Sequence, residues 1–222
     1  MILVLASLTT LSAKRRAGDT TYCWTDNTDA IGRIISLDSS RFLGAGFYVA
    51  PYGVVISASH VSHRDTTLFE HILSRQRDTL VAVHRILHRD LVVYSAIHRN
   101  AGPDESFQLG GSPSILDSVI YLGLREDGVL YRFNSHISAI GDYTLPGDSV
   151  PVRAIAIDAN IMGGMSGGPV LDTAGYVIGV LIGRLIHTPE GGRDSTAVLA
   201  MPTDTLRQLL EVTQQAEKTV RR

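Results

Sequence analysis

Short apolar runs alternate with turn residues along most of the chain. The runs are rich in Val, Ile, Leu and Tyr and are bounded by Gly, Pro, Asp and Asn, which is typical of β-strands joined by tight turns. The expected strands form two groups, with a loop at residues 100–105 between them. They cover residues 30–37, 43–50, 53–58, 79–86 and 91–97 in the first group and 118–124, 129–140, 151–158, 168–172, 176–186 and 196–201 in the second. This pattern predicts an all-β protein made of two small β-barrels.

The pattern changes near the C-terminus. Leu206, Leu209 and Leu210 recur at helical spacing, followed by Val212 or Thr213, and Pro202 and Thr203 supply a helix start. We expect a C-terminal α-helix over 203–216 that packs its leucines on the second barrel.

These elements predict a first barrel over 30–100, a second barrel over 101–202 and a helix with a short tail over 203–222. Residues 14–29 are polar and are expected to be a linker. Residues 1–13 are apolar or small and precede a basic cluster. That run is too short for a stable membrane span but has the length of a signal-peptide core. We expect export to the periplasm or the medium; the alternatives are an N-terminal strand or helix and a cytoplasmic protein.

Charge and cysteine content narrow the function classes. Twenty basic residues against 22 acidic ones give a net charge of -2, so we expect no nucleic-acid partner. The single cysteine, Cys23, cannot form an intramolecular disulfide, and its neighbours Tyr22 and Trp24 do not activate it as a nucleophile.

A glycine-rich run at residues 161–171 reads I M G G M S G G P V L, with Ser166 as its only hydroxyl residue. Glycine permits positive φ and close backbone approach, so such a loop can expose a serine hydroxyl and aim backbone amides at one point. A nucleophile needs both features, because an oxyanion develops beside it. The N–H groups of Gly164 and Ser166 are the expected oxyanion donors.

A serine nucleophile requires a base and a group that orients the base. His60 follows an apolar run within S A S H V S H, and Asp90 opens another within H R D L V V Y. We predict His60, Asp90 and Ser166 as a catalytic triad. The alternatives to Asp90, namely Asp65 and Asp78, lie in a polar stretch and are expected to be exposed.

His63, His84 and His88 are expected to play no part in the chemistry. His63 is predicted to be an exposed loop residue. His84 and His88 are four residues apart in a β-type run, where they would not share a face as helical metal ligands do. We therefore expect no metal and no cofactor.

Three ordered motifs carry a family resemblance. They read G A G F Y V A P Y G V V I S A S H V, R D L V V Y S A I and G G M S G G P V L D T A G Y V I G V. Together they resemble chymotrypsin-fold serine proteases, and most closely the protease domain of the HtrA (Deg) branch without a PDZ domain. The resemblance implies two six-stranded antiparallel β-barrels of the chymotrypsin type with a C-terminal α-helix. It also implies a trypsin-like serine endopeptidase that cleaves protein or peptide substrates through an acyl-enzyme.

Two residues depart from that pattern. Met165 stands where relatives that are activated by cleavage carry an aspartate, and Gly163 replaces a proline common in the HtrA branch. Activation by an N-terminal ion pair is therefore not expected. These departures motivate an alternative function, a catalytically weak protease-fold module that binds unfolded or partner proteins.

The resemblance also places the substrate pocket. By position it is lined by Asn160, Ile178, Gly179, Val180 and Gly183, which are apolar apart from Asn160. We expect cleavage after small or medium apolar residues. By analogy with HtrA relatives, Tyr22 and Trp24 could support a homotrimer.

Overall fold

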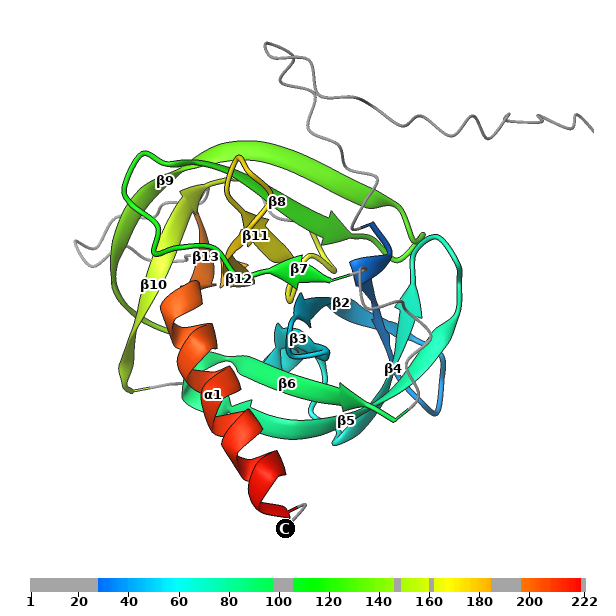
Figure 1. Ribbon diagram of the computed structural model, residues 1–222. Coiled ribbons are helices and arrows are strands. Elements are labelled where there is room, and N and C mark those ends of the chain that lie inside the picture. Colours follow the sequence, from blue (N-terminus) through cyan, green and yellow to red (C-terminus); the bar gives the residue numbers. More distant parts are fainter. Residues whose placement is uncertain (1–27, 98–105, 146–148, 160–161, 185–196, 221–222) are drawn as a thin grey trace, which may run out of the picture.

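The computed structural model describes residues 28–97, 106–145, 149–159, 162–184 and 197–220. It consists mainly of two antiparallel β-barrels that lie side by side, with one long helix against them (Figure 1). The predicted fold class, two six-stranded barrels and a C-terminal helix, is confirmed. Residues 1–27, which include the expected signal and most of the expected linker, lie outside the described residues.

The first barrel contains six strands in the order β1-β4-β5-β6-β3-β2 and closes through pairing of β1 with β2. A short 3-10 turn, η1 (Thr28–Ala30), leads into it. Its strands are β1 (Ile31–Ile35), β2 (Phe42–Ala50), β3 (Val54–Ala58), β4 (Thr66–His71), β5 (Arg77–Ile86) and β6 (Leu91–Ala96). The two-residue strand β7 (Phe107–Gln108) then runs parallel to β2 and leads to the second barrel.

The second barrel is closed in the order β10-β13-β12-β11-β8-β9. Its strands are β8 (Ser118–Leu124), β9 (Leu130–Thr144), β10 (Pro151–Asp158), β11 (Pro169–Leu171), β12 (Val177–Arg184) and β13 (Ala197–Pro202).

Strand β4 lies in a stretch that the sequence pattern assigned to a polar loop. It pairs with β1 on one side and with β5 on the other, and its Phe69, Glu70 and His71 are all buried. A strand whose buried positions hold charged and polar residues lacks the apolar pattern by which strands are predicted. The sequence pattern predicted no strand in this polar stretch for that reason.

The C-terminal helix α1 (Thr203–Val220) packs against both barrels. Leu206, Leu209 and Leu210 are at most 2% exposed, and each buried leucine contributes about 1.5–3 kcal/mol through its apolar surface. Thr213, rather than Val212, is the buried residue of the next turn. The helix contacts β5 of the first barrel as well as β12 and β13 of the second, so it spans more than the predicted surface.

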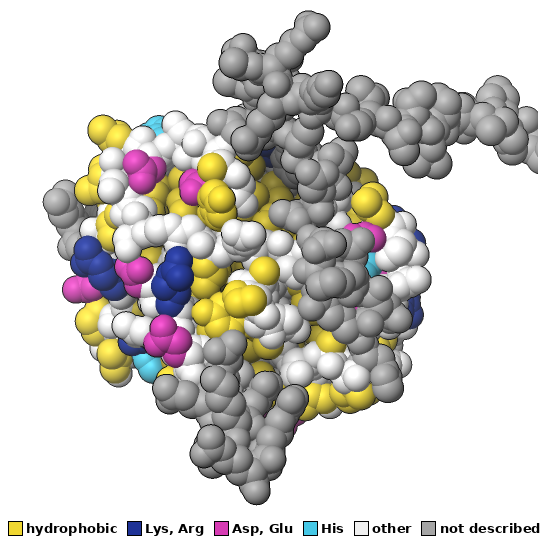
Figure 2. Space-filling view, in the orientation of Figure 1, with side chains coloured by type: hydrophobic (Ala, Val, Ile, Leu, Met, Phe, Trp, Pro, Cys, Tyr) yellow, Lys and Arg dark blue, Asp and Glu magenta, His cyan; other side chains and the backbone are white. Residues whose placement is uncertain are grey.

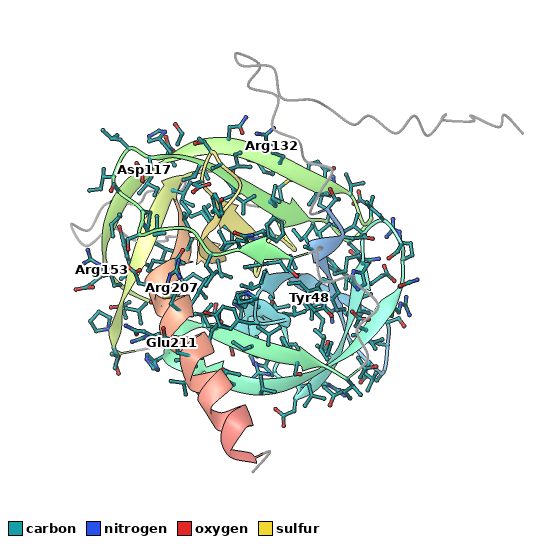
Figure 3. All side chains as sticks on the ribbon, in the orientation of Figure 1. Tyr48, Asp117, Arg132, Arg153, Arg207 and Glu211 are labelled. Atoms are coloured by element: carbon teal, nitrogen blue, oxygen red, sulfur yellow. The ribbon has the colours of Figure 1, made fainter. Side chains whose placement is uncertain are left out.

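Polar contacts tie the same helix to the segment that connects the barrels. The guanidinium of Arg207, which projects from α1 (Figure 3), donates to the Gly110 carbonyl at 2.6 Å. The Ser112 hydroxyl lies 2.9 Å from the Asp204 carboxylate. On the molecular face that carries α1, charged side chains of both signs are interspersed, in keeping with the small net charge (Figure 2). Among the described residues, no helix is long and apolar enough to cross a membrane.

Candidate active site

The structure brings His60 and Asp90 together at the end of the first barrel. His60 lies in the 3-10 turn η2 (Ser59–Val61) directly after β3, and Asp90 follows the turn η3 (Leu87–Arg89) directly before β6. Because β3 pairs with β6 at Ala58 and Leu91, the residues beyond that pair are neighbours.

The contact between the two side chains has the geometry of a base and its orienting carboxylate. Asp90 Oδ2 lies 2.5 Å from His60 Nδ1, and Asp90 Oδ1 accepts the His60 backbone N–H at 2.8 Å. The Asp90 side chain is 15% exposed and that of His60 is 47% exposed. The carboxylate thus fixes the ring through Nδ1 and leaves the imidazole accessible.

Arg85 stabilises the same turn through contacts that no sequence pattern predicted. Its guanidinium donates to the carbonyls of Ser59 and Ser62 at 3.1 and 2.6 Å, on either side of His60. Strand β5 also carries Arg77, Asp78 and His84, so the residue type alone did not single out Arg85. Arg85 therefore stabilises the backbone that carries the histidine.

A second His–Asp pair lies inside the first barrel. His71 Nε2 is 2.8 Å from Asp78 Oδ2, and the Tyr48 hydroxyl donates to the same oxygen at 2.6 Å. His71 and Asp78 are at most 1% exposed, and Tyr48 lies inside the ring of first-barrel strands (Figure 3). The expectation that Asp78 is exposed was wrong, because a buried histidine and a buried tyrosine pair with it. A buried pair cannot reach a substrate, whereas the His60–Asp90 pair can.

The loop that carries Ser166 consists of two successive turns. The Met165 N–H donates to the Met162 carbonyl at 3.4 Å, and the Gly168 N–H donates to the Met165 carbonyl at 3.0 Å. The third residue of each turn, Gly164 or Gly167, has positive φ (92° and 85°), which favours glycine at both positions.

The backbone amides of this loop differ in their hydrogen bonding. The Gly167 N–H donates to the Leu181 carbonyl at 2.8 Å, so it is occupied, like those of Met165 and Gly168. Within the described part of the chain, the N–H groups of Gly164 and Ser166 have no hydrogen-bond acceptor. The Gly163 N–H likewise has no acceptor among the described residues. The role of the Gly164 and Ser166 amides as oxyanion donors stays a prediction.

The Ser166 loop packs directly against the first barrel. The Ala45 N–H of β2 donates to the Ser166 carbonyl at 2.9 Å. A Cβ atom on Gly44 would lie 2.8 Å from Val61, the neighbour of His60, and 3.0 Å from the Ser166 carbonyl. Gly44 therefore lies between the segment that carries the histidine and the loop that carries the serine.

Met165 fixes the same loop to the second barrel. It is fully buried, and a Cβ atom on Gly123 of β8 would lie 2.4 Å from its Cγ and Cε atoms. Its Sδ atom also accepts the Met162 N–H at 3.2 Å. Gly163, by contrast, is exposed, and a Cβ atom there would meet nothing within 4 Å. An apolar side chain thus occupies the position where relatives that are activated by cleavage carry an aspartate.

The predicted substrate pocket is only partly described. Leu181 of β12 pairs with the Ser166 loop, since its N–H donates to the Gly168 carbonyl at 2.9 Å. Ile178 and Val180 are buried, and a Cβ atom on Gly179 would lie 3.0 Å from the Met201 carbonyl. A Cβ atom on Gly183, two residues beyond Leu181, would meet open space.

Two of the predicted pocket residues are not placed in one pocket by the described structure. Asn160 lies outside the described residues. Ile178 lines a different surface cavity of about 430 Å³, formed with residues 111–113, 116–118 and 172–173. The pocket residues therefore stay a prediction.

The comparisons with known proteins agree with this architecture. The family model of the trypsin-like peptidase domain matches residues 44–180. The crystal structure of the Rv3671c protease of M. tuberculosis H37Rv, in an inactive form, is similar with a TM-score of 0.67 and 18% identity over 84% of this chain and 90% of that one. The HtrA-type protease AlgW, solved with a decapeptide, has a TM-score of 0.67 and 19% identity over 86% of this chain and 66% of its own.

A comparison with curated proteins gives no match. At these identities the two crystal structures show the fold alone, whereas the family model covers more than half of the chain, including His60, Asp90 and Ser166. The predicted enzyme class, a trypsin-like serine protease, is confirmed at the level of family and fold. The chain belongs to the trypsin-like peptidase domain family.

Proposed function

We propose that this protein is a serine endopeptidase whose triad is His60, Asp90 and Ser166. The observation that carries the proposal is the 2.5 Å contact of Asp90 Oδ2 with Nδ1 of a half-exposed His60, at the end of the barrel against which the Ser166 loop packs. A carboxylate at Nδ1 holds the imidazole in the tautomer whose Nε2 is free to accept a proton.

In the proposed reaction, the Ser166 hydroxyl attacks the carbonyl carbon of the scissile peptide bond while His60 accepts its proton. The negative charge that develops on the carbonyl oxygen is stabilised by the N–H groups of Gly164 and Ser166. His60, now an imidazolium paired with Asp90, returns the proton to the leaving amine, and an acyl-enzyme remains. A water molecule then attacks the acyl-enzyme while His60 accepts its proton. The Ser166 oxygen leaves, takes the proton back from His60, and the carboxylic acid product is released.

We expect cleavage to follow small or medium apolar residues. This proposal is supported by the apolar composition of β12 around Leu181, the residue that pairs with the Ser166 loop. A peptide-library profile tests it, and a preference for lysine or arginine before the cleaved bond would contradict it.

The direct test of the proposed activity is proteolysis of unfolded casein by the wild type and by Ser166→Ala. The variant should lose roughly 10⁴- to 10⁶-fold in kcat, since a triad acts as a unit. Its circular dichroism spectrum should match that of the wild type. Equal proteolysis by both proteins would refute the assignment of Ser166.

The alternative function, a protease-fold module that binds unfolded proteins without cleaving them, is an outcome of the same test. It is favoured if wild-type protein retains casein in a pull-down but leaves it intact.

Export remains a proposal that rests on the apolar character of residues 1–13, and sequencing of the mature N-terminus tests it. A trimeric state is proposed by analogy only, and a mass measurement in solution tests it.

A further inference from the structure

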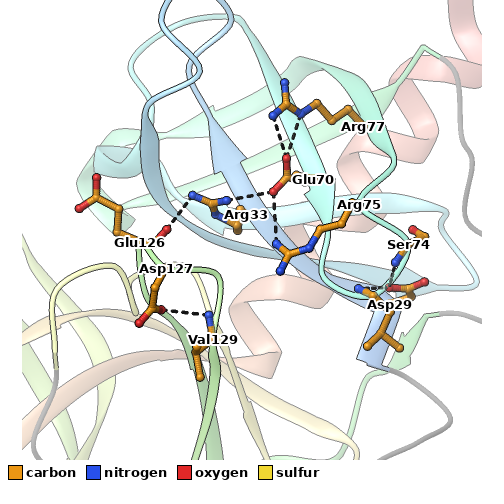
Figure 4. Close-up of polar contacts among 10 residues, drawn as sticks. Asp29, Arg33, Glu70, Ser74, Arg75, Arg77, Glu126, Asp127 and Val129 are labelled. Atoms are coloured by element: carbon orange, nitrogen blue, oxygen red, sulfur yellow. Dashed lines mark hydrogen bonds and ion pairs between the residues drawn. The ribbon is translucent and has the colours of Figure 1, made fainter. Parts of the chain in front are cut away.

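A cluster of ionic side chains lies where the first barrel meets the second (Figure 4). Arg33 of β1 and Glu70 of β4 are direct cross-strand partners, and so are Glu70 and Arg77 of β5. Glu70 accepts from Arg33 Nη1 at 3.0 Å and from Arg77 Nε at 2.9 Å, and its side chain is 7% exposed. Burial raises the pKa of the Glu70 carboxyl, but the hydrogen bonds from Arg77 and Arg33 lower it more, so Glu70 is a stable anion that holds Arg33 in place.

Arg33 also reaches across to the second barrel. Its Nη2 donates at 2.9 Å to the carbonyl of Glu126 (Figure 4), inside the turn that the Gly128 N–H closes onto the Arg125 carbonyl. This turn follows β8 directly, and Leu124 is the last residue of that strand. The arginine therefore fixes the end of β8 relative to the first barrel.

The same guanidinium packs on an aromatic ring. Arg33 Cζ lies 5.2 Å from the centroid of the Phe42 ring, which is cation–π geometry. That ring also lies against the turn that contains Gly164, since a Cβ atom on Gly164 would lie only 2.4 Å from Phe42 Cε1. The second close neighbour of Gly164 is the Leu124 carbonyl, at 2.7 Å from the same Cβ position. Both surfaces that confine Gly164 are thus connected to Arg33, one by direct packing and one through the turn after Leu124.

We propose that Arg33 is a positioning residue for the oxyanion hole, an inference that rests on the proposed function. Glu70 anchors the guanidinium, which then holds Phe42 and the end of β8 against the two sides of Gly164. Arg33 does not touch substrate in this arrangement. It keeps the Gly164 N–H oriented toward the developing oxyanion without an N-terminal ion pair.

The test compares Arg33→Met with Arg77→Met in the full-length protein. Both variants remove one direct partner of Glu70, but Arg77 lies on β5, which β4 separates from β1. Arg33→Met should lower kcat for a peptide substrate roughly 10- to 100-fold at nearly unchanged KM, because a displaced oxyanion donor affects the transition state more than the ground state. Arg77→Met should stay within about twofold of the wild type in both constants.

A readout that needs no turnover accompanies the kinetics. Backbone hydrogen exchange, followed on a peptide that covers residues 162–168, should become faster in Arg33→Met and stay unchanged in Arg77→Met. Arg33→Lys should recover at most part of the kcat and of the exchange protection that Arg33→Met loses. A single ammonium cannot bond Glu70 and the Glu126 carbonyl in the planar geometry of a guanidinium.

Two results would overturn the role of Arg33. One is wild-type kcat and wild-type exchange in Arg33→Met. The other is an equal loss in both methionine variants that parallels their free energies of unfolding. If the wild-type protein cleaves nothing, the proposed function fails, and the exchange comparison still decides whether Arg33 positions the turn.

Discussion

At the residue scale, the backbone of Asp90 explains how its carboxylate reaches the histidine. Asp90 has a φ of 51°, in the left-handed region that asparagine and aspartate adopt more readily than other non-glycine residues. Its own N–H donates to the Leu87 carbonyl, and its carbonyl accepts the Ser59 N–H at 2.9 Å. Backbone and side chain of Asp90 therefore both bind the turn that carries His60.

Glycine is required at position 44 because there is no room for a side chain, and not because the backbone has positive φ. A Cβ atom at Gly44 would press on Val61 and on the Ser166 carbonyl. Gly44→Ala should therefore separate the histidine turn from the serine loop, destabilise the protein by about 1–3 kcal/mol through overpacking, and lower kcat by roughly 10- to 100-fold. Urea unfolding and peptide hydrolysis measure the two effects.

Gly111→Ala is the matched control for that variant. A Cβ atom on Gly111 meets nothing within 4 Å, so this variant should stay within about 0.5 kcal/mol of the wild type and keep its activity. If both variants behave alike, close packing at Gly44 does not couple the two segments.

Residue types and their order predicted part of the local geometry of the candidate site. The glycines beside Ser166 indicated turns, and Gly164 and Gly167 do have positive φ. The structure places His60 and Asp90 in contact as predicted, while the catalytic roles stay predictions. The burial of Asp78 was not predictable, because its partners Tyr48 and His71 come from β2 and β4, and a sequence does not show which strands are neighbours.

At the element scale, β4 shows how a strand with polar residues is stabilised inside a barrel. His71 at its end lies between two acceptors, because its Nδ1 is 2.9 Å from the Asp29 carbonyl and its Nε2 is 2.8 Å from the Asp78 carboxylate. A ring that donates from both nitrogens is an imidazolium. The strand was missed for this same reason, since its buried polar groups find their partners only after the barrel has closed.

This cluster predicts a pH dependence of stability. Burial alone would lower the pKa of His71, but the hydrogen bonds to Asp78 and to the Asp29 carbonyl outweigh burial and raise the pKa above the ordinary value of 6.5. The charged ring therefore contributes stability that is fully present below pH 6.5 and is lost as the pH rises through the folded-state pKa. The titratable groups that face the ring are Asp78, Tyr48 and the Asp29 carboxylate, and the Asp29 carbonyl lies at Nδ1.

Urea unfolding of the wild type and of His71→Gln, measured between pH 5.5 and 9, checks this prediction. The stability difference between the two should shrink as the pH rises above about 6.5. Asp78→Asn supplies a second comparison that removes the carboxylate and keeps the ring. Parallel profiles for all three proteins would show that His71 is not charged in the folded state.

At the scale of the whole molecule, the proposed site lies at the junction between the two barrels. The first barrel supplies His60 and Asp90, and the second supplies the Ser166 loop. The hydrogen bond from Ala45 to the Ser166 carbonyl, the bridge from Arg33 to Glu126 and the packing of α1 on both barrels hold that junction. Neither hydrogen bond follows from a local sequence pattern, because each joins segments that are far apart in the chain. The helical spacing of the leucines predicted the packing of α1 on the second barrel, but not its contact with β5 of the first.

The central claim is that this junction yields an activated serine at Ser166. The most direct measurement is labelling of the full-length protein with a fluorophosphonate, with the modified residue located by mass spectrometry. The wild type should carry one adduct on Ser166, and Ser166→Ala and His60→Ala should carry none, since an unassisted serine hydroxyl is a weak nucleophile. An unlabelled wild-type protein, or an adduct on another residue, would contradict the account.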